Sequence, residues 1–175
     1  MFTDIVGFTA ASEQMGAEET AALLNTHFAV LGACIEAQGG TIDKYMGDAV
    51  MAFWGAPDEQ PDHAARACRA ALAIRAAMEA ANEHSEALGK TALALRIGVH
   101  SGPVIVGNIG APQRMNYTIV GDNVNISQRL EELGRTLPDP ASPVTIIVSQ
   151  ATHDAARIQG AEALGLQDIR GRREP

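Results

Sequence analysis

The fold of this chain is decided by residues 41–55, which read Thr-Ile-Asp-Lys-Tyr-Met-Gly-Asp-Ala-Val-Met-Ala-Phe-Trp-Gly. Residues 41–46 and 49–55 have the apolar and aromatic content of two strands, and Gly47-Asp48 between them is a two-residue turn suited to a tight hairpin. The second strand is apolar on both faces, which indicates that both faces are covered. The sequence therefore predicts a β-hairpin with a carboxylate at its tip.

Strands and helices are expected along the rest of the chain. The segment ending at Asp4 reads as a strand, and helical spacing of apolar residues predicts long helices over 17–38 and from Asp62 into the eighties. Residues 93–100 and 104–107 are expected to pair as strands through Ser101-Gly102-Pro103. The remaining predicted elements are a helix at 122–134 after the segment 117–121, a strand at 144–148, a short helix at 150–157, and two weak strand-like pieces around Leu164 and Ile169. This order indicates an α+β fold, with helices packed on a mostly antiparallel sheet.

The bulk composition is that of a globular domain. The chain has 175 residues, of which 46% are hydrophobic and 19% charged, and its formal net charge is −8. One domain is expected from this length. The acidic balance argues against nucleic acid as a partner, although a local cationic pocket for an anionic small molecule is compatible with it. No apolar run in the sequence suggests a membrane span, so no membrane contact is expected from this segment.

The chain is expected to be a single domain, residues 1–175, cut from a longer protein. Asp4 lies too close to the start for a full strand before it, and the sequence stops at Pro175 without a closing element. Cys34 and Cys68 match neither a zinc spacing nor a disulfide framework, so both are expected to be reduced in a cytoplasmic domain. A membrane anchor elsewhere in the longer protein would be compatible with this expectation.

Asp4 and Asp48 are candidates for a shared metal site. One carboxylate ends a strand and the other lies at a hairpin tip, so the two can meet on adjacent strands. Two facing hard oxygen donors suit Mg²⁺ or Mn²⁺ and are typical of phosphate chemistry. The glycine after Asp4 turns the backbone, and the free amides of a following helix could face phosphate oxygens. Taken separately, Asp4 could be a helix cap and Gly7 an ordinary turn residue.

Two further patterns are weak when taken alone. Lys44 in an apolar strand is more often an edge gatekeeper than a ligand contact. Asn125 and Arg129 are four residues apart and would project from one face of a helix. An amide beside a guanidinium could hold a ribose and a charged phosphorus centre, although surface pairs of this kind are common.

Together, three segments resemble the class III nucleotide cyclase catalytic domain of adenylate and guanylate cyclases. They are Phe-Thr-Asp-Ile-Val-Gly-Phe-Thr at 2–9, Lys-Tyr-Met-Gly-Asp at 44–48 and Gly-Asp-Asn-Val-Asn-Ile-Ser-Gln-Arg at 121–129. They occur in the family's order and spacing, and the likeness runs from residue 1 to about 172. The resemblance implies a ferredoxin-like, class III cyclase fold.

The resemblance also implies a role for each matched position. Asp4, Asp48 and the carbonyl of Ile5 would bind two divalent ions, Mg²⁺ or Mn²⁺. Asn125 would orient the ribose, and Arg129 would stabilise charge on the α-phosphate. Four further positions would contact the nucleotide phosphates: Gly7, Phe8 and Thr9 as the phosphate loop, and Arg172 at the terminal phosphates.

The base-selecting pair of the family maps to Lys44 and Thr118. A lysine can donate to N1 of adenine and a hydroxyl can accept from its 6-amino group, so the pair favours ATP, whereas guanylate-selective members resemble Glu and Cys. Many adenylate cyclases have Asp where this chain has Thr118. Threonine resembles a bacterial and soluble subgroup often responsive to bicarbonate, which makes bicarbonate a candidate partner.

The family builds its active site from two chains, one supplying the carboxylates and the other Lys44, Thr118, Asn125 and Arg129. Both sets occur here, so a homodimer with shared sites is expected. The sequence thus predicts an adenylate cyclase that converts ATP to cyclic AMP and pyrophosphate. The alternatives are a guanylate cyclase and a non-catalytic nucleotide-binding or dimerisation module. A diguanylate cyclase is set aside because its Gly-Gly-(Asp/Glu)-Glu-Phe signature is absent.

Overall fold

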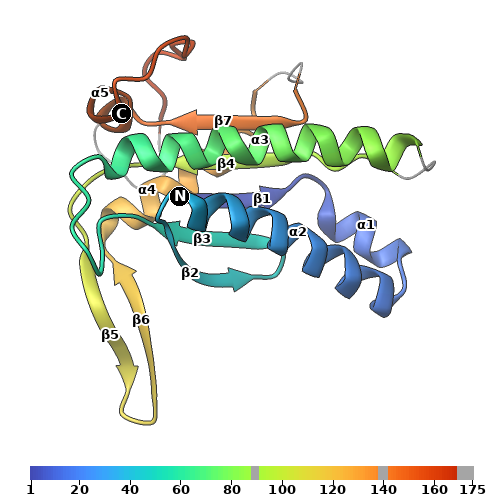
Figure 1. The fold of residues 1–175 in the computed structure, drawn as a ribbon, viewed down its shortest axis with the longest axis horizontal. Helices are drawn as coiled ribbons and strands as arrows, with labels where there is room; N and C mark the ends of the chain where they lie inside the picture. The colour runs from blue at the N-terminus through green and yellow to red at the C-terminus, as the bar shows by residue number, and fades with distance from the viewer. Residues whose placement is uncertain (88–90, 138–141, 169–175) are drawn as a thin grey trace.

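The computed structural model describes residues 1–87, 91–137 and 142–168 (Figure 1). Its strands are β1 (Phe2–Ile5), β2 (Thr41–Met46), β3 (Ala49–Phe53), β4 (Leu95–Val99), β5 (Ile105–Ala111), β6 (Arg114–Val120) and β7 (Val144–Val148). Its helices are α1 (Phe8–Gln14), α2 (Ala17–Ala37), α3 (His63–Ala87), α4 (Asp122–Leu133) and α5 (Gln150–Ala156).

Five strands form the central sheet in the order β2-β3-β1-β4-β7. The pairs β2–β3, β3–β1 and β1–β4 are antiparallel, and β4–β7 is parallel. The α+β class with a mostly antiparallel sheet is therefore confirmed. The predicted tight hairpin is also confirmed, because Gly47 adopts a positive φ of 65° at the turn between β2 and β3.

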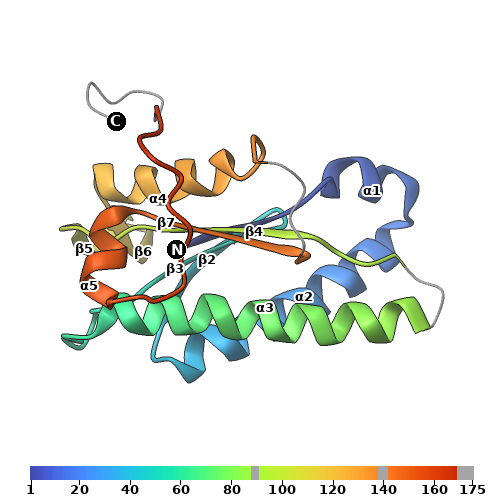
Figure 2. The ribbon, with the colours of Figure 1, turned by 90° about the horizontal axis from the view of Figure 1, so that it is seen from above.

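Helices cover both faces of this sheet (Figure 2). On one face, α2 and α3 pack against apolar side chains of alternate strand positions. The buried cluster there includes Leu31, Ile35, Val50, Ile74 and Ile97. On the other face, α4 packs with a smaller cluster of Ile126, Leu130 and Ile147. Because side chains alternate along a strand, Ile97 lies on the α2–α3 face, and Arg96 and Gly98 lie on the α4 face.

Gly98 allows α4 to approach the backbone of β4. A Cβ at this position would lie 2.2 Å from the carbonyl oxygen of Ser127 and 2.4 Å from the amide nitrogen of Glu131. The Ser127 hydroxyl also donates to the Gly98 carbonyl at 3.0 Å. This close contact fixes the position of the helix that carries Asn125 and Arg129.

The predicted pairing of residues 93–100 with 104–107 is wrong. β4 pairs with β1 and β7, whereas β5 pairs with β6 in a separate two-stranded sheet. The β5–β6 hairpin projects away from the body of the domain (Figure 1). β6 was not among the expected strands. Residues 161–168 contain no strand around Leu164, and Ile169 lies outside the described residues.

Helix α2 is long and apolar enough to cross a membrane by length and mean hydropathy. The expectation that the sequence holds no such segment was therefore too strict. In this fold, however, α2 packs against α3 and β2, and its Leu31 and Ile35 side chains are fully buried. One face of α2 therefore packs on the core of the domain.

His27 on α2 gives the domain a predictable acid sensitivity. Its side chain is 4% exposed, neither ring nitrogen has a hydrogen-bond partner among the described residues, and burial lowers its pKa from 6.5 to about 4. The unfolded chain therefore binds a proton that the folded chain does not as the pH falls through 6.5. We expect the free energy of unfolding to drop by about 2 kcal/mol from this residue between pH 7.5 and pH 5.

Urea unfolding at several pH values checks this expectation. His27→Leu should flatten the loss of stability between pH 7.5 and pH 5, whereas His84→Gln, at an exposed position, should leave it unchanged. An identical pH dependence in wild type and His27→Leu would show that His27 is not held neutral in the folded state.

Candidate active site

The structure brings the two predicted carboxylates together at one end of β1. The Asp48 Oδ2 atom at the β2–β3 turn accepts a hydrogen bond from the Ile5 amide at 3.0 Å. Burial raises the pKa of Asp48 above its usual range, and the nearby Asp4 carboxylate raises it further. Two carboxylates that repel each other in a half-buried place are an arrangement that a divalent cation would stabilise.

Arg96 and Glu131 extend this carboxylate site and were missed by the sequence analysis. The Arg96 guanidinium contacts Asp4 Oδ2 through Nη2 and Glu131 Oε1 through Nε, the latter at 2.8 Å. Arg135 Nη2 lies 3.5 Å from the same Asp4 oxygen. The Arg96 side chain is only 10% exposed. A charged residue inside the apolar run 93–100 was the signal that could have identified it, because a buried guanidinium requires an anionic partner.

The donor set fits a divalent ion. The described residues hold no group of three or more His, Cys, Asp or Glu side chains suited to a metal. Two carboxylates and the Ile5 carbonyl are hard oxygen donors, and Mg²⁺ commonly takes one or two carboxylates with waters and substrate phosphates completing its shell. These donors would hold an ion only in part and would leave the rest of its shell to water and a bound ligand.

The predicted phosphate loop follows directly on this site. Gly7 has a φ of 71° and precedes α1, which begins at Phe8. Gly7 and Thr9 are exposed, so the backbone of this turn is open to a ligand. The predicted contact of Arg172 with the terminal phosphates lies outside the described residues.

Lys44 and Thr118 meet although they come from different sheets. Lys44 Nζ lies 3.1 Å from Thr118 Oγ1, which joins β2 to the β5–β6 hairpin. The sequence analysis missed Asp43, whose carboxylate contacts both residues: Thr118 Oγ1 donates to Oδ2 at 2.6 Å, and Lys44 Nζ lies 2.8 Å from Oδ1. The predicted base-selecting pair is thus one connected polar group.

Asn125 and Arg129 lie on α4, as the spacing predicted. Asn125 is exposed and Arg129 is half-buried. Arg129 Nη1 is buried and has no hydrogen-bond partner among the described residues, so this donor remains available to an anion. In the described parts of the chain, no hydrogen bond or ion pair joins Asn125 or Arg129 to the carboxylate site or to the Lys44–Thr118 pair.

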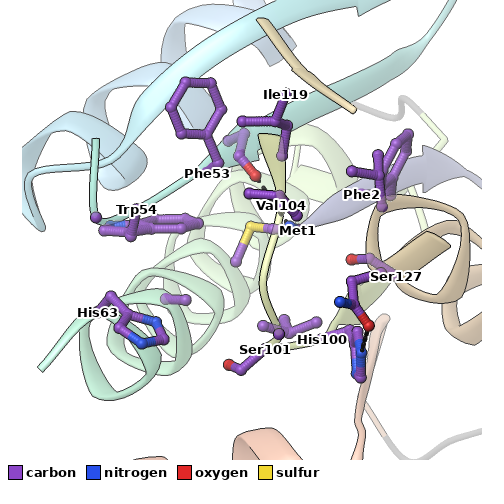
Figure 3. A pocket seen from close by; sticks show the side chains of 17 residues that line it. Met1, Phe2, Phe53, Trp54, His63, His100, Ser101, Val104, Ile119 and Ser127 are labelled. Atoms are coloured by element: carbon purple, nitrogen blue, oxygen red, sulfur yellow. Dashed lines mark hydrogen bonds between the residues drawn. The ribbon is translucent and has the colours of Figure 1, made fainter. Parts of the chain in front are cut away.

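A pocket of about 250 Å³ lies elsewhere, between the start of β1, the end of β3 and the start of α4 (Figure 3). Its wall is mostly apolar, with Phe2, Phe53 and Trp54 among its residues. His100 stands at its polar side and contacts Ser149 at 2.8 Å and Asn123 at 2.9 Å. None of the predicted site residues lines this pocket, so the chemistry of the carboxylates is not located there.

Comparison with known proteins identifies the family of this chain. The family model described as the adenylate and guanylate cyclase catalytic domain matches residues 1–173. Adenylate cyclase 1 of Rhizobium meliloti is 42% identical over 77% of the chain, and an adenylate cyclase of Anabaena cylindrica is 39% identical over 76%. The chain spans 20% and 26% of the length of these two relatives.

Solved structures include both kinds of cyclase. The adenylyl cyclase CyaB from P. aeruginosa matches with a TM-score of 0.79 and 36% identity, over 89% of this chain and 78% of that one. The guanylyl cyclase Cya2 also has a TM-score of 0.79, with 33% identity over 95% and 85% of the two chains. Fold, family model and relatives agree: this chain belongs to the adenylate and guanylate cyclase catalytic domain family, the class III cyclases.

Proposed function

We propose that this domain is an adenylate cyclase that converts ATP to 3′,5′-cyclic AMP and pyrophosphate. The observation that carries the choice of ATP is the contact between Lys44 and Thr118. The lysine offers a donor and the threonine an acceptor, which complement N1 and the 6-amino group of adenine. The adenylate cyclases among the relatives support the same choice, although guanylyl cyclases are also structural neighbours.

The residues suit a mechanism of positioning and charge stabilisation. Asp4, Asp48 and the Ile5 carbonyl would hold two divalent ions, which supply Lewis acidity at the ribose 3′-oxygen and the phosphates when bound. The 3′-oxygen forms a bond to the α-phosphorus, the bond to the pyrophosphate oxygen breaks in line, and the hydroxyl proton passes to solvent. Asn125 would hold the ribose, and Arg129 would stabilise the charge that develops on the α-phosphate.

We further propose that two copies of this chain share each site. No contact in the described monomer joins the carboxylates to Asn125 or Arg129. The β5–β6 hairpin also exposes apolar side chains on both faces, including Ile105 at 69% and Met115 at 56% exposed. A two-stranded hairpin is marginally stable alone, and a second copy that packs on it would bury this surface.

Several finer expectations remain proposals. These are activation by bicarbonate, a cytoplasmic location, the absence of nucleic acid and membrane partners, the extent 1–175 of the domain within a longer protein, and the terminal-phosphate role of Arg172. The guanylate cyclase and the non-catalytic binding module remain the alternatives to the proposed activity.

Product analysis tests the activity and its base preference. We expect cyclic AMP from ATP at a rate at least ten-fold above cyclic GMP from GTP, with Mg²⁺ or Mn²⁺ present, because a mismatched hydrogen-bond pair leaves buried polar groups unpaired at about 1–3 kcal/mol each. The double change Lys44→Glu and Thr118→Cys should erode this preference. Equal rates with both nucleotides would contradict base reading by this pair, and no product with either would favour the binding module.

A further inference from the structure

Asp43 occupies an unusual place on β2. Its side chain is fully buried, although it lies next to the half-exposed Lys44 in a strand beside the hairpin. The β2–β3 register shifts between Ile42 and Lys44, which pair with the consecutive residues Ala52 and Met51. Consecutive residues of β3 point to opposite faces, so Ile42 and Lys44 do as well. The bulge at Asp43 thus leaves Ile42 in the core and puts Lys44 on the α4 face.

The Asp43 carboxylate accepts two hydrogen bonds and forms one ion pair. Its Oδ2 accepts from the Thr118 hydroxyl at 2.6 Å and from the Ile119 amide at 3.2 Å. Its Oδ1 lies 2.8 Å from Lys44 Nζ. The two hydrogen bonds tie β2 to β6, and the ion pair restrains the lysine.

These bonds determine which hydrogen-bonding groups remain for a ligand. A hydroxyl has one proton and two lone pairs, and an ionised carboxylate can only accept. The Thr118 proton is therefore committed to Asp43, and one lone pair accepts from Lys44 at 3.1 Å. One acceptor position remains on Thr118. Lys44 donates one of its three N–H bonds to Thr118 and is held near Asp43 Oδ1 by charge, so its ammonium keeps donors for a ligand.

We propose that Asp43 is a specificity-determining positioning residue, which fixes the Thr118 hydroxyl as an acceptor and holds the Lys44 ammonium beside it as a donor toward the purine base. This inference rests on the proposed adenylate cyclase function and deepens it. A base whose N1 faces Lys44 must accept a hydrogen bond at N1 and must donate one from its 6-substituent to Thr118, as adenine does. Guanine carries an N–H at position 1 and an oxygen at position 6, so it meets the opposite polarity at both points.

A double-mutant cycle tests this role of Asp43. In the otherwise wild-type protein, Asp43→Ala frees the Thr118 proton to donate to an oxygen, and we expect the ratio of kcat/KM for ATP over GTP to fall by about ten-fold or more. In a Thr118→Val background, which has no hydroxyl to orient, the same change should move the ratio by no more than about three-fold. Equal shifts in both backgrounds would mean that Asp43 does not act through Thr118, and would overturn the proposal.

Asp43→Asn covers the case in which Asp43→Ala fails to fold. Its amide oxygen can still accept from Thr118 and the Ile119 amide, while its NH₂ group faces Lys44 in place of a carboxylate oxygen. We expect the KM for ATP to rise several-fold while the ATP preference stays within about three-fold of wild type. A KM and a ratio both unchanged from wild type would overturn the proposal.

Two further measurements distinguish a failure of this proposal from a failure of the proposed cyclase function. Thr41→Val removes another β2 hydrogen bond, to the Ala56 carbonyl at 3.1 Å, and should change stability without changing the nucleotide ratio. The double-mutant cycle of Asp43 and Thr118 is then repeated with binding as the readout. Calorimetric titration measures the affinity of each variant for the α,β-methylene analogues of ATP and GTP. Selective analogue binding with the expected coupling, but no cyclic product, would sustain the role of Asp43 and reject the cyclase function. Cyclic AMP production with additive mutational effects would sustain the function and reject the role of Asp43.

Discussion

Asp48→Ala is expected to lower cyclic AMP production by at least about a thousand-fold. Asp48 supplies one of the two carboxylates proposed to hold the ions, and loss of its charge would weaken the binding of both ions that neutralise the phosphates and the developing 3′-oxyanion. The same loss is expected for Asp4→Ala. Initial rates of cyclic AMP formation at saturating ATP measure the effect.

The fold should survive this substitution. Burial and the neighbouring Asp4 raise the pKa of Asp48, so its charge is a cost to the folded state, and this cost offsets the loss of the hydrogen bonds that its carboxylate accepts, including the one from the Ile5 amide. Asp48→Asn keeps an acceptor for that amide and should be equally inactive. Asp58→Ala, at an exposed loop position, serves as the matched control with wild-type activity. Full turnover by a folded Asp48→Asn protein would exclude the two-carboxylate site.

Mixing two inactive variants is expected to restore activity. Asp48→Ala damages the half of the site that holds ions, and Arg129→Ala damages the half that stabilises the α-phosphate. If each site takes one half from each copy, a heterodimer of the two variants has one site with both lesions and one with neither. Random exchange makes about half of the dimers mixed, so about a quarter of wild-type activity should return.

The matched control mixes two lesions of the same half. Asp48→Ala with Asp4→Ala should regain nothing, because every site of every dimer then lacks a carboxylate. Subunit exchange is verified with one variant carrying a size tag. Verified exchange without recovery in the Asp48→Ala and Arg129→Ala mixture would show that each chain holds a complete site.

Local patterns made much of this fold predictable. The Gly47-Asp48 turn, the apolar β3 and the helical spacing of α2, α3 and α4 each depend on residues close in sequence, and all were predicted with similar bounds. The pairing of β4 was not predictable in the same way. Sequence neighbours usually pair, but β4 is buried between β1 and β7, whereas β5 pairs with β6 outside the sheet.

The site residues show the same difference between local patterns and long-range contacts. Asp4, Asp48 and Lys44 were identified as candidates from local motifs, and Thr118 came from the resemblance to the cyclase family. The structure places these four residues in two contact groups. Arg96 and Asp43 were missed because their significance lies in long-range partners. Arg96 reaches Asp4 and Glu131, and Asp43 reaches Thr118 across two different sheets. A charged residue inside an apolar strand marks such a position but does not say which partner neutralises it.

The projecting hairpin is joined to α4 by a single residue. β6 ends at Val120, α4 begins at Asp122, and Gly121 between them has a φ of 147°, a torsion that residues with a Cβ rarely adopt. After this glycine, α4 packs directly against the backbone of Gly98, which has no side chain. The hairpin that we propose to pack on a second copy is therefore joined through a single residue to the helix that carries Arg129.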